Sequence, residues 1–236
     1  MDNAKLCTDW NVSDLDRFDL TIEILNPTPE RLDDGLIFFQ WHFNFKGEGG
    51  YIGLQLTETG KKAIFSIWQP IKGCMGELKG EHAKPVYSCL HDYSWELNKK
   101  YKLTVKMGEE ENDGLWWIGE IYDYENDNST IIGKILIPKR FEKLKGYNYY
   151  TCIETGYFED DSIIPDIKVK FSESIGYKNT DEYLLRDNLR KFTVFMTDKS
   201  EKSKVVINND LSYILEAGGR TARVLRARAS PNPVTS

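Results

Sequence analysis

The sequence predicts an all-β protein folded as an antiparallel β-sandwich, and two observations carry this prediction. Aromatic residues make up 13% of the 236 residues, and with the many Ile and Thr they favour half-buried pleated surfaces over helices. Several segments alternate apolar and polar residues between turn signals, whereas no segment has a long apolar stripe of period 3.6. The length suits one sandwich of about 170 residues with a small appendage.

Four strands are expected near the start of the chain. Residues 18–25 alternate Phe, Leu and Ile with Asp, Thr and Glu, as in a strand with one wet face. Residues 36–45 carry aromatic groups on both faces, so this strand is covered on both sides or exposes rings for a function. Residues 51–58 and 63–69 form a hairpin with a Thr-Gly tip. Residues 71–92 are expected to form a long irregular loop.

The second half of the chain repeats this pattern. Residues 99–107 form another half-exposed strand, and two apolar runs joined by a polar turn predict a second hairpin over 115–138. One helical turn is expected within 139–146. Strands over 148–158 and 166–175 complete the sandwich.

Three regions are expected from these patterns. The sandwich domain spans residues 1–176, and an appendage of a short helix and a hairpin spans 177–217. Residues 218–236 contain four arginines and no acidic or aromatic residue, so they predict a disordered tail that is native or an extension.

Charge and hydropathy exclude several classes of partner. The net charge of −6 and the pI of about 5.3 oppose binding to a nucleic-acid backbone. No apolar stretch approaches the roughly 20 residues that span a bilayer, and the first residues lack the pattern of a signal peptide. We therefore expect a soluble chain.

Nucleophilic and metal chemistry have little support in the sequence. The histidines are His42, His82 and His91; His42 lies in an aromatic strand, where a structural role is favoured, and no Gly-x-Ser-x-Gly occurs. The cysteines show no zinc spacing, so no metal site is expected. A disulfide between Cys74 and Cys89 and free thiols are equally open, because the compartment is unknown. No cofactor is expected; calcium at residues 123–128 is an alternative to a solvated hairpin tip.

Three glutamates interrupt apolar strands and are candidates for acid–base catalysis. They are Glu23, Glu120 and Glu154. Two carboxylates about 5 to 10 Å apart on one face can hydrolyse a glycosidic bond. Outward-facing strand residues are the favoured interpretation, and Glu154 is the first to test by mutation.

The aromatic residues are the more informative candidates, since sugar rings stack their apolar faces on Trp and Tyr. The candidate ligand-binding residues are Trp41, Trp68, Trp95, Trp116, Trp117, Tyr149 and Tyr150. Trp116 and Trp117 are adjacent in a strand and must point to opposite faces. For any single Trp, a place in the core is the favoured interpretation.

One stretch of motifs resembles a known family. In order, these motifs are FFQWHFNFKGEGGYIGLQ, KKAIFSIW, a Gly-rich loop ending at Cys89, WWIGEI, IIGKILIP and CIETGY. Over residues 35–172 they resemble the domain of unknown function 3472 family. The resemblance implies a concanavalin-like or jelly-roll sandwich in bacterial proteins that are mostly secreted or surface-associated, and it implies no established reaction or catalytic residue.

These observations lead to three hypotheses. The leading one is a non-enzymatic module that binds a glycan, or another extended ligand, on an aromatic face. The alternatives are a polysaccharide hydrolase or lyase with a carboxylate pair, and a structural or protein-interaction domain that uses its strand edges. The ligand, the oligomeric state and the compartment stay open.

Overall fold

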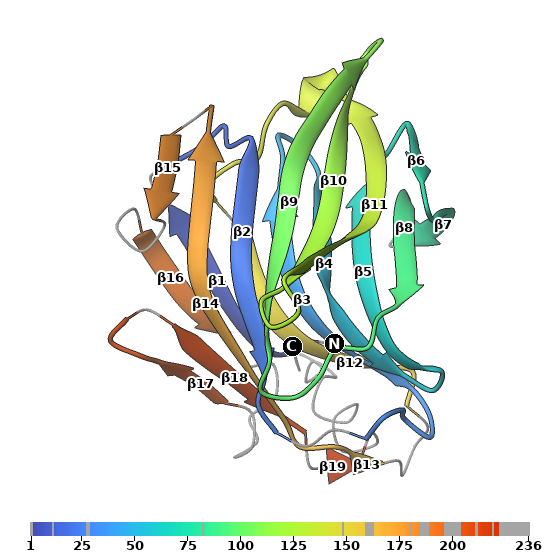
Figure 1. Cartoon of the computed structure of the whole chain (residues 1–236), viewed down its shortest axis with the longest axis vertical. Coiled ribbons are helices and arrows are strands. Elements are labelled where there is room, and N and C mark those ends of the chain that lie inside the picture. The colour runs from blue at the N-terminus through green and yellow to red at the C-terminus, as the bar shows by residue number, and fades with distance from the viewer. Residues whose placement is uncertain are drawn as a thin grey trace, which may run out of the picture.

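Two antiparallel sheets pack face to face in the computed structural model of this chain (Figure 1). The structure describes residues 2–10, 12–26, 29–81, 83–147, 149–158, 163–179, 181–184, 189–195, 204–210, 212–218 and 220–221. No helix among them is long and apolar enough to cross a membrane. The predicted all-β sandwich is confirmed.

Sheet I has the strand order β16-β1-β12-β3-β4-β5-β8-β7. Its strands are β16 (Leu189–Phe195), β1 (Asp2–Trp10), β12 (Tyr149–Gly156), β3 (Leu36–Asn44), β4 (Gly49–Thr57), β5 (Gly60–Trp68), β8 (Lys84–Asp92) and β7 (Glu77–Glu81).

Sheet II has the order β17-β18-β14-β2-β9-β10-β11-β6, and β15 pairs with β14. Its strands are β17 (Lys204–Ile207), β18 (Tyr213–Ala217), β14 (Ile167–Lys178), β2 (Arg17–Ile24), β9 (Lys100–Glu111), β10 (Gly114–Asp123), β11 (Asn128–Pro138), β6 (Lys72–Cys74) and β15 (Asp181–Leu184). The short strands β13 (Ile163–Ile164) and β19 (Arg220–Thr221) pair with each other, and the 3-10 helix η1 spans Lys139–Phe141, where one helical turn was expected.

The core fills the space between the sheets and is dominated by aromatic rings. Strand alternation turns every second side chain inward, so Phe39, Trp41 and Phe43 of β3 meet Trp117 and Phe18 from sheet II in one buried cluster. Phe18 stacks on Trp41 with ring centroids 4.1 Å apart. Such pairs add stability beyond the area they bury.

Two expectations about the chain are wrong. Residues 71–92, expected to form an irregular loop, contain β6, β7 and β8, because main-chain pairing with β11 and β5 orders a segment that has little alternation of its own. The expected helix near residues 181–192 is absent from the described residues, where β15 and the start of β16 stand in strand conformation.

The appendage is also not separate from the sandwich. β16 pairs with β1 in sheet I, and β18 pairs with β14 in sheet II. The expected boundary at residue 176 falls inside β14. The expected disordered tail begins with Gly218 and β19, and its residues 222–236 lie outside the described part of the chain.

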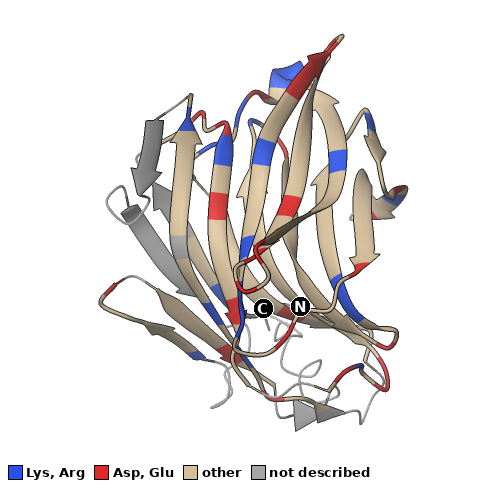
Figure 2. Ribbon diagram, viewed as in Figure 1, with Lys and Arg blue, Asp and Glu red and all other residues tan. Residues whose placement is uncertain are grey.

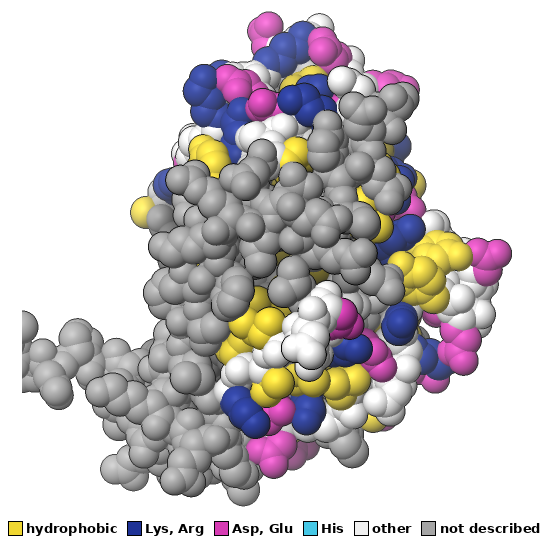
Figure 3. All heavy atoms as spheres, turned by 90° about the vertical axis from the view of Figure 1, so that its left-hand side faces the viewer, with side chains coloured by type: hydrophobic (Ala, Val, Ile, Leu, Met, Phe, Trp, Pro, Cys, Tyr) yellow, Lys and Arg dark blue, Asp and Glu magenta, His cyan; other side chains and the backbone are white. Residues whose placement is uncertain are grey.

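Lys or Arg and Asp or Glu residues both occur along the strands of sheet II (Figure 2). Within it, Arg17 contacts Asp19 and Lys106 contacts Glu120. At the side of the sandwich near β14 and β16, the described side chains mix apolar and charged groups without a patch of one sign (Figure 3).

Candidate ligand-binding site

Four of the seven candidate aromatic residues lie in the core and offer no surface to a ligand. Trp41, Trp95, Trp117 and Tyr149 are at most 1% exposed. Their positions in the strands turn them toward the opposite sheet or, for Trp95, toward Phe39. Assigning these four to ligand binding is therefore wrong.

Trp116 lies on the outer face of sheet II, opposite in direction to Trp117 as expected. Its indole N–H donates to Glu111 over 2.8 Å, and the Lys72 ammonium lies 5.5 Å from its ring centroid. This tryptophan is therefore engaged by its own sheet and lies apart from the remaining candidates.

Trp68 and Tyr150 share the outer face of sheet I, and His42 lies between them. The His42 ring stacks on Tyr150 at 4.1 Å and on Trp68 at 6.1 Å between centroids. His42 is 9% exposed, which agrees with the structural role expected for it. Burial lowers the pKa of His42 to about 3, with a further contribution from Lys5, so the ring is neutral.

A hollow of about 410 Å³ opens beside Trp68 at the end of sheet I. Trp68 and Tyr147 supply its aromatic surface, while Asn44, Glu48 and Lys84 supply polar groups. Tyr147 is 47% exposed. A Cβ at Gly49 would lie 2.8 Å from the Asn44 side-chain oxygen, so a glycine there keeps this polar wall in place.

The polar groups of the hollow are held by one another. Glu48 accepts hydrogen bonds from the Lys84 ammonium at 2.8 Å and from the Gln69 amide. The Glu48 side chain is only 9% exposed, whereas that of Lys84 is 50% exposed. The Glu48 carboxylate is thus held in place at the wall of the hollow, and the Lys84 ammonium is accessible to a ligand. Together the two groups carry little net charge.

A row of hydroxyl groups continues from His42 across the same face. The register places His42 beside Tyr51, Tyr51 beside Ser66 and Ser66 beside Ser88. Ser66 and Ser88 are joined by a hydrogen bond of 2.9 Å, and the Tyr51 hydroxyl donates to Glu81 over 3.2 Å. Burial raises the pKa of Tyr51 to about 12, which keeps it a hydrogen-bond donor.

The three candidate glutamates do not form a carboxylate pair. Glu154 is on the outer face of sheet I, where the Gln40 amide donates to it over 3.1 Å. Glu23 and Glu120 lie on the outer face of sheet II, at β2 and β10. Sheets pack about 10 Å apart, and these side chains point away from each other. The predicted catalytic pairs of Glu154 with Glu23 and of Glu154 with Glu120 are therefore both wrong, because glycosidases need carboxyl groups within roughly 5–10 Å of each other.

Glu23 and Glu120 belong to the same sheet, but strand β9 lies between their strands. Glu23 is opposite Lys100 of β9, and Glu120 is opposite Thr104, four residues further along the same strand. Glu120 is bound by Lys106 and by Ser129, whose hydroxyl donates over 2.7 Å. Its role in the structure is that of an ion-paired surface residue.

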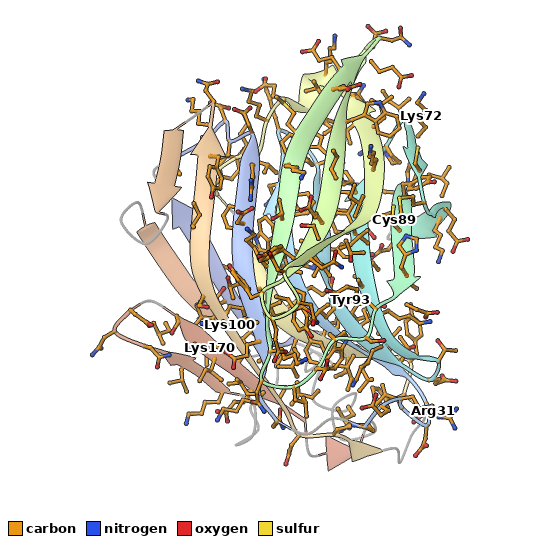
Figure 4. The ribbon with its side chains drawn as sticks, in the orientation of Figure 1. Arg31, Lys72, Cys89, Tyr93, Lys100 and Lys170 are labelled. Atoms are coloured by element: carbon orange, nitrogen blue, oxygen red, sulfur yellow. The ribbon has the colours of Figure 1, made fainter. Side chains whose placement is uncertain are left out.

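Cys74 and Cys89 lie close together as free thiols, without the disulfide considered above. The Cys89 thiol donates to the Cys74 carbonyl over 3.4 Å, and burial raises the pKa of Cys89 to about 12. Lys72 and Cys89 are labelled at this edge of the sandwich in Figure 4.

The remaining candidates are the turn at 123–128, considered as a calcium site, and the histidines His82 and His91. Asp123 closes the turn at 123–128 by accepting the backbone N–H of Glu125 at 2.9 Å, and no cluster of three metal-binding side chains occurs in the described part of the chain. His91 has a buried, unpartnered Nε2 atom, and His82 lies outside the described residues.

Sequence reasoning missed three residues that line the hollow, Tyr147, Glu48 and Lys84. They come from three separate segments, and no spacing links them. The one signal was the Gly-rich turn at 46–50, which brings Glu48 to the end of the aromatic strand.

The comparisons with known proteins concern the fold. No family model matches the chain, and no curated protein matches it. Among solved structures, scytalido-glutamic peptidase, solved with a transition state analog inhibitor, is similar with a TM-score of 0.53 and 10% identity, over 92% of this chain and 98% of that one.

Two lyases are more distant. The PL-14 alginate lyase of Aplysia kurodai has a TM-score of 0.32 and 9% identity, over 62% of this chain and 72% of its own. The alginate lyase vAL-1 of Chlorella virus has a TM-score of 0.28 and 10% identity, over 65% and 84%. The chain therefore has a β-sandwich fold similar over nearly its whole length to that of a glutamic peptidase.

Proposed function

We propose that this protein binds a glycan through the hollow beside Trp68. The single observation that carries the proposal is the placement of two accessible aromatic side chains, Trp68 and Tyr147, around an open hollow with polar groups on its other sides. Apolar sugar faces stack on such rings, while hydroxyls take up polar contacts.

The polar groups favour a neutral sugar. Glu48 and Lys84 neutralise each other, so a charged ligand would gain little from one without opposing the other. The carboxylate accepts hydrogen bonds from sugar hydroxyl groups, and the ammonium donates hydrogen bonds to ring or hydroxyl oxygens. His42 and Tyr150 lie beyond Trp68 on the outer face of sheet I, where His42 stacks on both rings and Lys5 covers Tyr150 at 3.4 Å, so the aromatic contacts of the ligand are those of Trp68 and Tyr147.

The similarity to a glutamic peptidase is consistent with a β-sandwich that binds a ligand on one face. At 10% identity, this similarity gives no support for the same reaction in this chain. A catalytic role for Glu154 has less support in the geometry. The Gln40 amide donates to Glu154, and neither of the other two candidate glutamates lies on the same face to act as its acid–base partner. Membership of the domain of unknown function 3472 family, with an extracellular setting, stays a prediction.

The test is a glycan array followed by isothermal titration of the best neutral oligosaccharide. Trp68→Ala is expected to weaken binding by about 1–3 kcal/mol, roughly 5- to 150-fold, because a stacked aromatic anchor is removed. Tyr147→Ala should weaken binding by a smaller factor, since Tyr147 covers only one wall.

Trp116→Ala is the matched control, because Trp116 is a partly exposed tryptophan on the opposite sheet. It should leave the affinity unchanged. Equal losses for Trp68→Ala and Trp116→Ala, or no binding of any glycan at millimolar concentration, would overturn the proposal.

A further inference from the structure

Strand β7 ends sheet I, and its outer side pairs with no strand in the described part of the chain. Leu78 is 63% exposed, and a Cβ at Gly80 would meet no atom within 4 Å. The edge is open to solvent. Exposed strand edges are templates for pairing with another chain.

The backbone groups of β7 that face outward are those of Leu78 and Gly80. Gly80 stands opposite Pro85 of β8, which has no N–H, and the Pro85 carbonyl instead accepts a hydrogen bond from Gln69 on its other side, at 2.8 Å. Gly80 therefore forms no ladder bonds to Pro85. Antiparallel pairs alternate between bonded and non-bonded, so Leu78, opposite Tyr87, also turns its N–H and C=O to the free edge.

We propose that β7 pairs with β7 of a second copy of this chain, antiparallel, about a two-fold axis at Leu78. In this register Leu78 meets Leu78 of the second copy and forms two main-chain hydrogen bonds with it. Glu77 of each copy then stands opposite Lys79 of the other. The pairing is self-complementary, as a two-fold interface requires.

The charges select this register over its neighbour. A two-fold axis at Lys79 would use the same backbone groups, but it would set Lys79 against Lys79 and Glu77 against Glu81, and like charges directly opposite destabilise a sheet. The exposed Leu78 side chain is covered by its counterpart in this register, whereas an axis at Lys79 would leave it opposite Gly80. A five-residue strand predicts a weak dimer that forms with increasing concentration.

Sedimentation equilibrium of the full chain tests the pairing. The wild type should be a concentration-dependent dimer. Glu77→Lys and Lys79→Glu should each weaken dimerisation by on the order of tenfold or more, since two attractive pairs become repulsive. The double variant E77K/K79E should restore it.

The decisive sample is a mixture of the two single variants. An E77K chain carries two lysines and a K79E chain two glutamates, so the mixture should form heterodimers although each variant alone is mainly monomeric. Circular dichroism checks that each variant folds. A wild type that stays monomeric up to about 1 mM, or a mixture no more associated than its parts, would overturn the proposal.

Discussion

The two outer faces of the sandwich differ in how far their buried polar side chains are hydrogen-bonded. On sheet II, polar side chains satisfy one another: Asp19, 1% exposed, accepts from Arg17 at 2.8 and 2.6 Å and from Thr104 at 2.8 Å. On sheet I, the buried Gln40 Oε1 and His42 Nε2 atoms have no hydrogen-bond partner in the structure. Buried polar groups without partners cost stability. The face of sheet II is thus built for stability, and that of sheet I tolerates a cost beside its hollow.

The largest effect is expected from breaking the sheet II network. Asp19→Ala removes the acceptor of the buried Thr104 hydroxyl and of the partly exposed Arg17 guanidinium, and it should lower the free energy of unfolding by about 2–3 kcal/mol, measured by urea denaturation. Glu125→Ala, which removes an exposed carboxylate, is the control and should change stability by less than ~1 kcal/mol. A similar loss for both variants would remove the distinction between the faces.

A pH-dependent effect is expected on sheet I from His42. The pKa of His42 is lowered to about 3 in the folded protein, so below pH 6.5 the unfolded chain binds a proton that the folded chain does not. Stability therefore falls as the pH is lowered, by about 2 kcal/mol between pH 7 and pH 5.

His42→Phe keeps a ring in the stack and removes this titration. Unfolding free energies at pH 7 and pH 5 should differ less for the variant than for the wild type, by about that 2 kcal/mol. An unchanged pH dependence would show that His42 titrates alike in both states.

The smallest effect is expected from Gln40→Met. The substitution loses the hydrogen bond to Glu154 but also removes the unpartnered Oε1 atom, and these changes oppose each other. Thermal and urea unfolding should move by less than about 1 kcal/mol. A loss above about 2 kcal/mol would place Gln40 with the stabilising groups typified by Asp19.

Much of the fold could be predicted because strand alternation is a local signal. The strands expected at 18–25 and 36–45 correspond to β2 and β3. Strand β7 has no such alternation in burial, since four of its five residues are exposed, and it depends on pairing with β8. The prediction of a short helix in the appendage was wrong because strand pairing with β14 and β1 decides the conformation of its described residues.

The candidate site could be predicted only in part. Alternation shows that Trp116 and Trp117 face opposite sides but not which of them faces the core. Trp68 was a candidate from its strand, whereas Tyr147 joins it only because β12 returns the chain to the edge of β3. Contacts between distant segments have no local sequence signal.

The step between β6 and β7 has a mechanical consequence. Cys74 pairs in sheet II and Glu77 in sheet I, so the two residues between them, Met75 and Gly76, cross from one sheet to the other. This two-residue connection links the two sheets covalently at one edge of the sandwich. Sliding one sheet relative to the other at that edge would therefore strain the connection directly.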